Sequence, residues 1–104
     1  MNIEHLKEYV SSNSIEWRKH VFERMLERDI SRSDVKEVLL NGELISNYPK
    51  DKPFPSALFF KLVNGRPLHV VAAIDSHIGK VFIITAYEPS LEIFKKDFKT
   101  RRKS

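Results

Sequence analysis

The hydrophobic period of the sequence changes at Asn41-Gly42, and this change restricts the chain to helices first and strands afterwards. Before this point apolar residues recur every three or four positions, as on one face of a helix. After it apolar and polar residues tend to alternate, as along a half-buried strand. A chain of 104 residues has room for one core. The sequence therefore predicts a single α+β domain over residues 1–104, with N-terminal helices packed on a sheet.

Three helices are expected before Gly42. The first spans residues 3–10 and the second residues 16–27. The third follows Ser31, which has Asp34 three residues later as in a capping box. Its end is marked by the Asn41-Gly42 pair. The apolar stripe expected on the second helix consists of Trp17, Val21, Phe22, Met25 and Leu26.

Four strands are expected after Gly42, at residues 44–48, 56–63, 68–74 and 81–87. Asn64-Gly65 is a strong turn signal and joins the second and third strands as a hairpin. Three prolines between residues 49 and 55 exclude a regular element there, because proline lacks a backbone donor and restricts its neighbours. The pattern predicts a four-stranded antiparallel sheet.

The net charge of +4 is concentrated in a basic C-terminal tail at about residues 95–104. The chain has 18 basic and 14 acidic residues. The tail holds six of the basic residues and one of the acidic residues, which leaves 12 basic and 13 acidic residues elsewhere. A basic segment beside a nearly neutral body suits a polyanion or an acidic protein as partner. The alternative is a solvated, frayed terminus. The basic residues are Lys95, Lys96, Lys99, Arg101, Arg102 and Lys103.

Several classes of protein are disfavoured by what the sequence lacks. It has no cysteine, so it has neither disulfides nor thiolate ligands. Its four histidines show no metal-ligand spacing, and no glycine-rich phosphate loop is present, so we expect no metal and no cofactor. No apolar run is long enough to cross a membrane and no export signal is visible, so we expect a soluble cytoplasmic protein. Any catalysis should then be metal-free acid–base chemistry.

The second expected helix carries a ridge of nitrogen side chains. His20, Arg24 and Arg28 recur every four residues and therefore lie along one flank of that helix. The planar fork of arginine matches phosphate oxygens, so this ridge is a candidate phosphate-binding site. The alternative is an ordinary surface on which Glu23 and Glu27 neutralise the two arginines.

Two strand residues are candidates for acid–base chemistry. His69 lies on the opposite side of its strand from Leu68 and Val70, and its usual pKa near 6.5 suits a general base. The alternative is a packed, hydrogen-bonded histidine. Tyr87 ends the last strand beside the basic tail, where it could stack on a base or donate a proton, or simply close the edge of the core.

Between about His20 and Arg102, several motifs of the chain together resemble those of a known family. They include Gly65-Arg66-Pro67-Leu68-His69-Val70-Val71, Ile84-Thr85-Ala86-Tyr87-Glu88-Pro89 and Asp97-Phe98-Lys99-x-Arg101-Arg102, as well as the ridge around His20-x-x-x-Arg24-Met25-x-x-Arg28. The pattern resembles a prokaryotic family of small domains of unknown function. That family looks related to the RelE/ParE-like toxin superfamily, which includes RelE-type and MqsR-type messenger-RNA interferases.

The resemblance implies a RelE-like fold, with a helical layer over a curved antiparallel sheet that carries a basic groove. It also implies the toxin of a type II toxin–antitoxin system, acting as a metal-independent endoribonuclease on RNA, including ribosome-bound RNA. Its partner would be an antitoxin, and one with a zinc-binding domain is the type expected. Two alternatives stay open: a non-enzymatic RNA- or protein-binding module, and a ParE-like inhibitor of a protein target.

The roles expected in such an enzyme can be assigned to residues of this chain. His69 would be the base, Arg24 and Arg101 would hold the phosphate, and Tyr87 would be the acid or stacking group, with His20 as an alternative acid–base residue. Lys61 and Arg66 are the only cations expected on the central strands, fewer than RelE-type proteins carry. The remaining residues expected to bind RNA are Arg28, Lys99 and Arg102.

Overall fold

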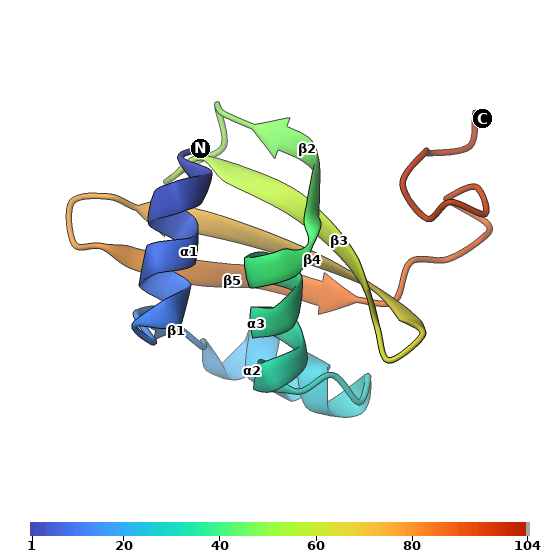
Figure 1. The fold of residues 1–104 in the computed structure, drawn as a ribbon, viewed down its shortest axis with the longest axis horizontal. Coiled ribbons are helices and arrows are strands. Elements are labelled where there is room, and N and C mark those ends of the chain that lie inside the picture. The colour runs from blue at the N-terminus through green and yellow to red at the C-terminus, as the bar shows by residue number, and fades with distance from the viewer. Residues whose placement is uncertain (104) are drawn as a thin grey trace.

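The computed structural model describes residues 1–103 and shows an α+β fold with three helices and a five-stranded sheet (Figure 1). The α+β class expected from the sequence is confirmed. In chain order the elements are α1 (Ile3–Ser11), β1 (Ile15–Glu16), α2 (Lys19–Glu27), α3 (Arg32–Asn41), β2 (Glu43–Tyr48), β3 (Ser56–Val63), β4 (Arg66–Asp75) and β5 (Lys80–Tyr87).

The sheet is mixed, with strand order β1-β5-β4-β3-β2. Strands β2 to β5 are antiparallel neighbours, whereas β1 pairs with β5 in parallel through Ile15 opposite Val81 and Glu16 opposite Phe82. The expectation of four antiparallel strands was therefore wrong. A strand of two residues is too short to show an alternating pattern, and its partner lies far along the chain.

The start of the second helix also differs from the expectation. Glu16 belongs to β1, so α2 begins at Lys19 and Trp17 precedes the helix. The apolar stripe on this helix is narrower than expected. Met25 is fully buried as expected, but the Leu26 side chain is turned outward and is 64% exposed. The shorter helix places its buried side against the sheet and turns Leu26 to solvent.

Local signals predicted the other boundaries well. Ser31 and Asp34 exchange reciprocal side-chain to backbone bonds at the start of α3. Asn64 and Gly65 both have positive φ angles, 53° and 80°, as a two-residue hairpin turn of type I′ requires. Gly42 has an extended backbone, so this position requires glycine for a steric reason and not for its φ angle. A Cβ there would lie within 2.7 Å of the carbonyl oxygen of Phe60 and closer still to that of Val38.

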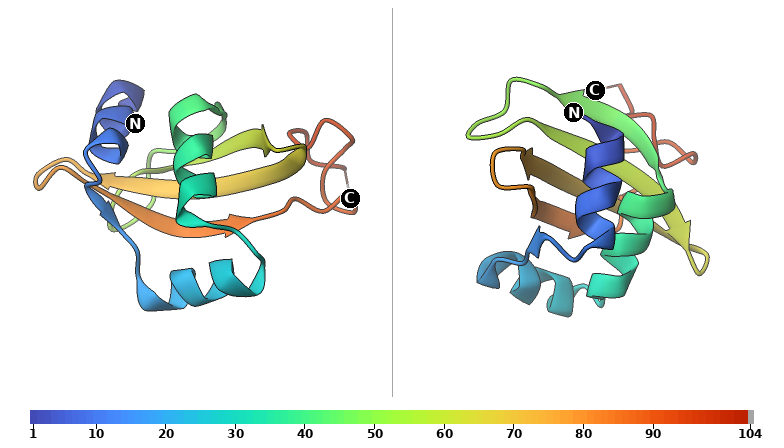
Figure 2. Two further views of the ribbon diagram at one scale, coloured as in Figure 1. Left: turned by 60° about the horizontal axis from the view of Figure 1, so that its bottom comes forward. Right: turned by 60° about the vertical axis from the view of Figure 1, so that its left-hand side comes forward.

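Helices α1 and α3 lie side by side on one face of the sheet (Figure 2). The core fills the space between them and the sheet. Helix α2 instead runs along the outer edge of β5 (Figures 1 and 2). It lies next to the part of β5 that follows the two residues paired with β1. The largest fully buried side chains of the core include Leu6, Val10, Met25, Val35, Val38, Leu39, Phe59, Leu68, Val70 and Ile83.

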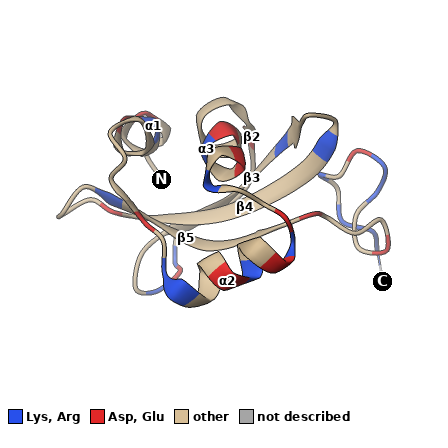
Figure 3. Ribbon diagram, turned by 90° about the horizontal axis from the view of Figure 1, so that it is seen from below, with Lys and Arg blue, Asp and Glu red and all other residues tan. Residues whose placement is uncertain are grey.

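The opposite side of the sheet, here called the open face, is bordered by α2 along β5 and is otherwise covered by loops (Figure 3). The register places His69 opposite Tyr87 and Val71 opposite Thr85 on this side, and Phe60 of β3 is the other neighbour of His69. The C-terminal segment covers the end of the face where β4 begins and β5 ends. No helix among residues 1–103 is long and apolar enough to cross a membrane.

Candidate functional site

His69 and Tyr87, which the sequence singled out separately, form a hydrogen-bonded pair on the open face. The Nε2 atom of His69 lies 2.6 Å from the carbonyl oxygen of Phe98, and Nδ1 lies 3.2 Å from the Tyr87 hydroxyl. A carbonyl oxygen only accepts, so Nε2 carries the proton and donates it to Phe98. Nδ1 is then the acceptor, and the Tyr87 hydroxyl donates to it.

The surroundings of the pair hold both groups in their neutral forms. His69 is 0% exposed and packs edge-to-face with Phe60 and with Phe94. Burial lowers the pKa of His69, and the bond to Phe98 partly opposes this. Burial also raises the pKa of the half-buried Tyr87, with a further increase from Tyr48 and an opposing decrease from Arg101. His69 therefore has no ring nitrogen free for a substrate, and the outermost polar atom of the pair is the Tyr87 hydroxyl oxygen.

The basic tail folds back on itself as a short hairpin over residues 93–102, here called the C-terminal hairpin. Phe94 and Arg101 form an antiparallel bridge, and Lys95 N–H donates to Thr100 at 2.8 Å. The turn is closed by the Asp97 carboxylate, which accepts bonds from Thr100 and Lys99 that lower its pKa to about 2. The segment thus folds back against the sheet at this point.

The cations of the C-terminal hairpin differ in their contacts. Lys99 lies 3.3 Å from Glu43, and Arg102 Nε donates to the Leu91 carbonyl at 2.6 Å. The Arg101 guanidinium sits 5.7 Å from the centre of the Phe94 ring, close enough to Tyr87 to act on its pKa. Among the described residues, no carboxylate lies within 4.0 Å of Lys95, Lys96 or Arg101.

The ridge expected on the second helix lines a hollow of about 190 Å³ between α2 and β5, here called the α2–β5 groove. His20, Arg24 and Arg28 form its helical wall and Thr85 is part of its sheet wall. Figure 3 shows the alternating basic and acidic positions along α2. Arg24 pairs with Glu27 at 3.3 Å, but both side chains are more than half exposed. That pair is too well solvated to prevent Arg24 from binding a phosphate.

Arg28 and Arg66 have structural partners. Arg28 donates to the Ala86 carbonyl at 2.9 Å. This bond gives a partner to a backbone group at the end of β5, where β1 does not pair with the strand. Arg66 pairs with Glu88 at 3.0 Å and donates to the backbone carbonyls of Arg28 and Asp29. Together the two arginines tie the turn between α2 and α3 to the ends of β4 and β5.

Lys61 is separated from the other expected RNA-binding residues. Its amino group lies 3.2 Å from Glu37 of α3, on the face of the sheet that the helices cover. The structure thus gathers His69, Tyr87 and Arg101 at one place on the open face. It places His20, Arg24 and Arg28 in the neighbouring groove, and Lys61 across the sheet.

We expect Arg66→Gln to lower the free energy of unfolding by about 2 kcal/mol, because it removes a charged donor from two backbone carbonyls. Arg24→Gln is the matched control: the ion pair of Arg24 with Glu27 is exposed, so the effect should stay below about 0.5 kcal/mol. Urea unfolding followed by circular dichroism measures both. Equal effects of the two substitutions would contradict a structural role for Arg66.

Sequence reasoning predicted Phe94 and Phe98 only as an apolar anchor of the basic tail, and it did not connect any aromatic residue with the surroundings of the pair. Phe60, Phe94 and Phe98 enclose His69, and Tyr48 approaches Tyr87 from β2. Phe60 was detectable in principle, because strand alternation puts it on the opposite side from Phe59. Nothing periodic marks Phe94 or Phe98, since they lie in a hairpin without regular strands.

The fold and site define a class: a small α+β domain whose open sheet face carries a tyrosine–histidine pair beside two groups of cations. The chain belongs to the family described as Domain of unknown function (DUF4258), whose model matches residues 17–88. The matched part contains the α2–β5 groove and the His69–Tyr87 pair, whereas α1 and the C-terminal hairpin lie outside it. No curated protein and no solved structure matches the chain.

Proposed function

We propose that this protein is the toxin of a type II toxin–antitoxin system and acts as a metal-independent endoribonuclease on its open face. One observation carries the proposal: the half-buried Tyr87 hydroxyl is bonded to the neutral, buried His69 and lies near the Arg101 guanidinium. The resemblance of the sequence to a family that looks related to the RelE/ParE-like toxin superfamily supports the same proposal. An acid–base pair beside a cation is what metal-free RNA cleavage requires.

In this mechanism His69 acts on the substrate through Tyr87. The Tyr87 oxygen takes the proton of a ribose 2′-hydroxyl while its own proton passes to Nδ1 of His69. The 2′-oxygen attacks the adjacent phosphorus, the bond from phosphorus to the 5′-oxygen breaks, and the leaving oxygen takes a proton from water. The products are a 2′,3′-cyclic phosphate and a 5′-hydroxyl end. The Nε2–H bond to Phe98 stabilises the imidazolium that forms.

The cations have separate roles in this proposal. Arg101 is closest to the reacting pair and stabilises the extra negative charge on the phosphate in the transition state. Arg24 and His20 bind the neighbouring part of the RNA backbone in the α2–β5 groove. An antitoxin, including one with a zinc-binding domain, would block this face in the cytoplasm until RNA, free or ribosome-bound, is to be cut.

Inducible expression in bacteria tests the proposal. We expect the wild-type chain to arrest growth and to generate new RNA 5′-hydroxyl ends, and Tyr87→Phe to do neither. Phenylalanine removes the hydroxyl and keeps the ring, so the fold should be preserved, which circular dichroism verifies. Arrest with intact RNA would point instead to a ParE-like protein target. Normal growth with unchanged RNA ends would contradict the toxin proposal.

A second candidate function is an RNA-binding module that breaks no bond. The contacts of His69 favour this second function. Both ring nitrogens are bonded to groups of the same chain, so neither is free to take a proton directly from a substrate. Such a module would bind RNA in a salt-dependent way, leave it intact, and lose no affinity in Tyr87→Phe.

A further inference from the structure

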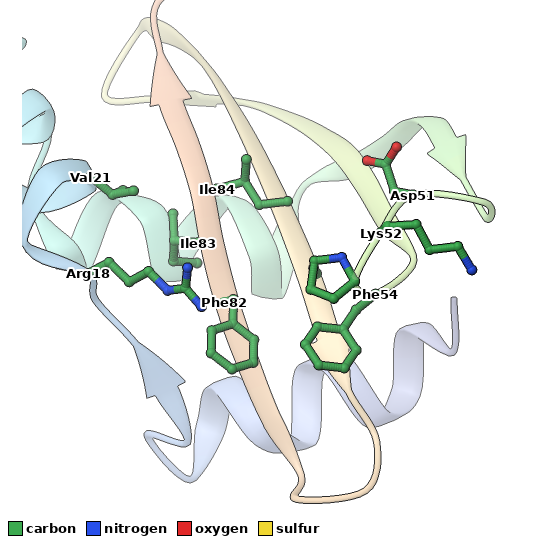
Figure 4. A pocket seen from close by; sticks show the side chains of 10 residues that line it. Arg18, Val21, Asp51, Lys52, Phe54, Phe82, Ile83 and Ile84 are labelled. Carbon is green, nitrogen blue, oxygen red and sulfur yellow. The ribbon is translucent and has the colours of Figure 1, made fainter.

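A second hollow, of about 210 Å³, lies on the open face away from the C-terminal hairpin (Figure 4). Its walls include Arg18, Phe54, Phe82 and Ile84, and we call it the Phe54–Phe82 pocket. Phe82 comes from β5, and Phe54 comes from the loop between β2 and β3, which folds over the sheet. None of the chemistry assigned to His69 and Tyr87 uses these residues.

The two phenyl rings form a flat apolar surface. Their centres are 5.8 Å apart and their planes differ by only 8°, and Figure 4 shows both faces turned the same way. Both side chains are half-buried, and 46% of the neighbouring Ile84 is exposed. The Arg18 guanidinium lies 5.2 Å from the centre of the Phe82 ring. A planar ligand could stack on this surface, with a cation at its edge.

The pocket continues directly into the α2–β5 groove, because Val21 and Ile84 line both hollows. Arg18 precedes α2, and His20 and Arg24 follow within that helix, so nitrogen-bearing side chains run along one side of the combined hollow. Asp51 is the acidic residue in the wall, and its carboxylate accepts a bond from Ser56 Oγ. The combined hollow therefore offers an aromatic floor at one end and phosphate-binding groups along its length.

We propose that the Phe54–Phe82 pocket binds one nucleobase of single-stranded RNA, whose sugar–phosphate backbone follows the α2–β5 groove toward Tyr87. Bases of a duplex are stacked on one another and cannot reach the rings, so the substrate must be unpaired here. Stacking needs only the flat face that every base has, so the pocket contributes affinity with little sequence preference. This inference rests on RNA being the ligand of the proposed function.

Fluorescence anisotropy with a labelled oligouridylate of eight nucleotides tests the pocket, with an abasic oligomer of the same length and charge as the comparison. We expect the double variant Phe54→Leu/Phe82→Leu to lose roughly five- to hundredfold in affinity for the oligouridylate. Its affinity for the abasic oligomer should not change. Leucine keeps the apolar cover of the sheet but lacks the aromatic face, so the fold should persist, and thermal unfolding verifies this.

Phe22→Leu is the matched control. Phe22 is also half-buried beneath a guanidinium, that of Arg32 at 4.4 Å, but it lines neither hollow. Its substitution should leave both affinities unchanged. If the wild type binds both oligomers equally, or the double variant keeps full affinity, the pocket proposal is overturned while an RNA ligand stands. If the wild type binds neither oligomer, the RNA-directed function and the pocket both fail.

Discussion

Replacing His69 by alanine is expected to release the C-terminal hairpin from the sheet and to lower the free energy of unfolding by about 3 kcal/mol. The substitution leaves a cavity where a fully buried ring stood, and it removes the side chain that donates to the Phe98 carbonyl. Hydrogen exchange measured by mass spectrometry should then show faster exchange of the hairpin amides, among them those of Lys95 and Arg102. Urea unfolding measures the loss of stability. His20→Ala, at an exposed position, should change it by less than about 0.5 kcal/mol.

The same residue should make stability depend on pH in a definite direction. In the unfolded chain His69 takes a proton near pH 6.5, whereas burial keeps its pKa lower in the folded protein. Below about pH 6.5 the unfolded state therefore binds a proton that the folded state does not, and stability falls as the pH drops. The fall ends once the pH passes the folded pKa. The ring of His69 is bonded to the Tyr87 hydroxyl and packs against Phe94, and the Arg101 guanidinium lies 5.7 Å from the centre of the Phe94 ring.

His69→Gln separates this effect from all other titrations. Glutamine can donate to the Phe98 carbonyl as Nε2 does, but it does not titrate. Between about pH 7.5 and about pH 5.5 the wild type should lose more stability than this variant. Parallel profiles would show that His69 is protonated in the folded state as easily as in the unfolded chain, and would contradict the neutral pair.

Most of the fold was predictable because its boundaries depend on local signals. The capping box at Ser31 and the turn at Asn64-Gly65 need only neighbouring residues, and both have the expected geometry. The parallel strand β1 was not predictable in this way. It consists of two residues whose conformation is set by pairing with Val81 and Phe82.

The site was predictable in its residues but not in its arrangement. Helical spacing alone predicts that His20 and Arg24 lie on one side of α2, and both line the groove. The contact between His69 and Tyr87 depends on the register of β4 and β5, which contains an irregularity at Val71/Ala72. The burial of His69 depends on a hairpin without periodic residues. No single segment of the sequence therefore indicates that this histidine is neutral and enclosed.

The positive charge of the C-terminal hairpin is expected to dominate RNA binding. Lys95, Lys96 and Arg101 have no close carboxylate among residues 1–103, whereas Lys99 is paired with Glu43. Each phosphate contact to a single strand contributes about 0.7 to the slope of log affinity against log salt concentration. If all three contact phosphates, changing them together to glutamine should make this negative slope less steep by about 2 and lower the affinity near 0.1 M salt by roughly a hundredfold.

A control with the same change in net charge shows whether position matters. Lys7, Lys36 and Lys61 lie on α1, α3 and the helix-covered face of β3, and changing these three to glutamine also removes three charges. Salt titrations of oligouridylate binding should show a much smaller change of slope for this variant. Because nonspecific attraction depends on total charge, equal losses in the two triple variants would mean that the C-terminal hairpin is not the contact surface. A loss confined to the hairpin variant would place the RNA backbone on the open face beside Tyr87.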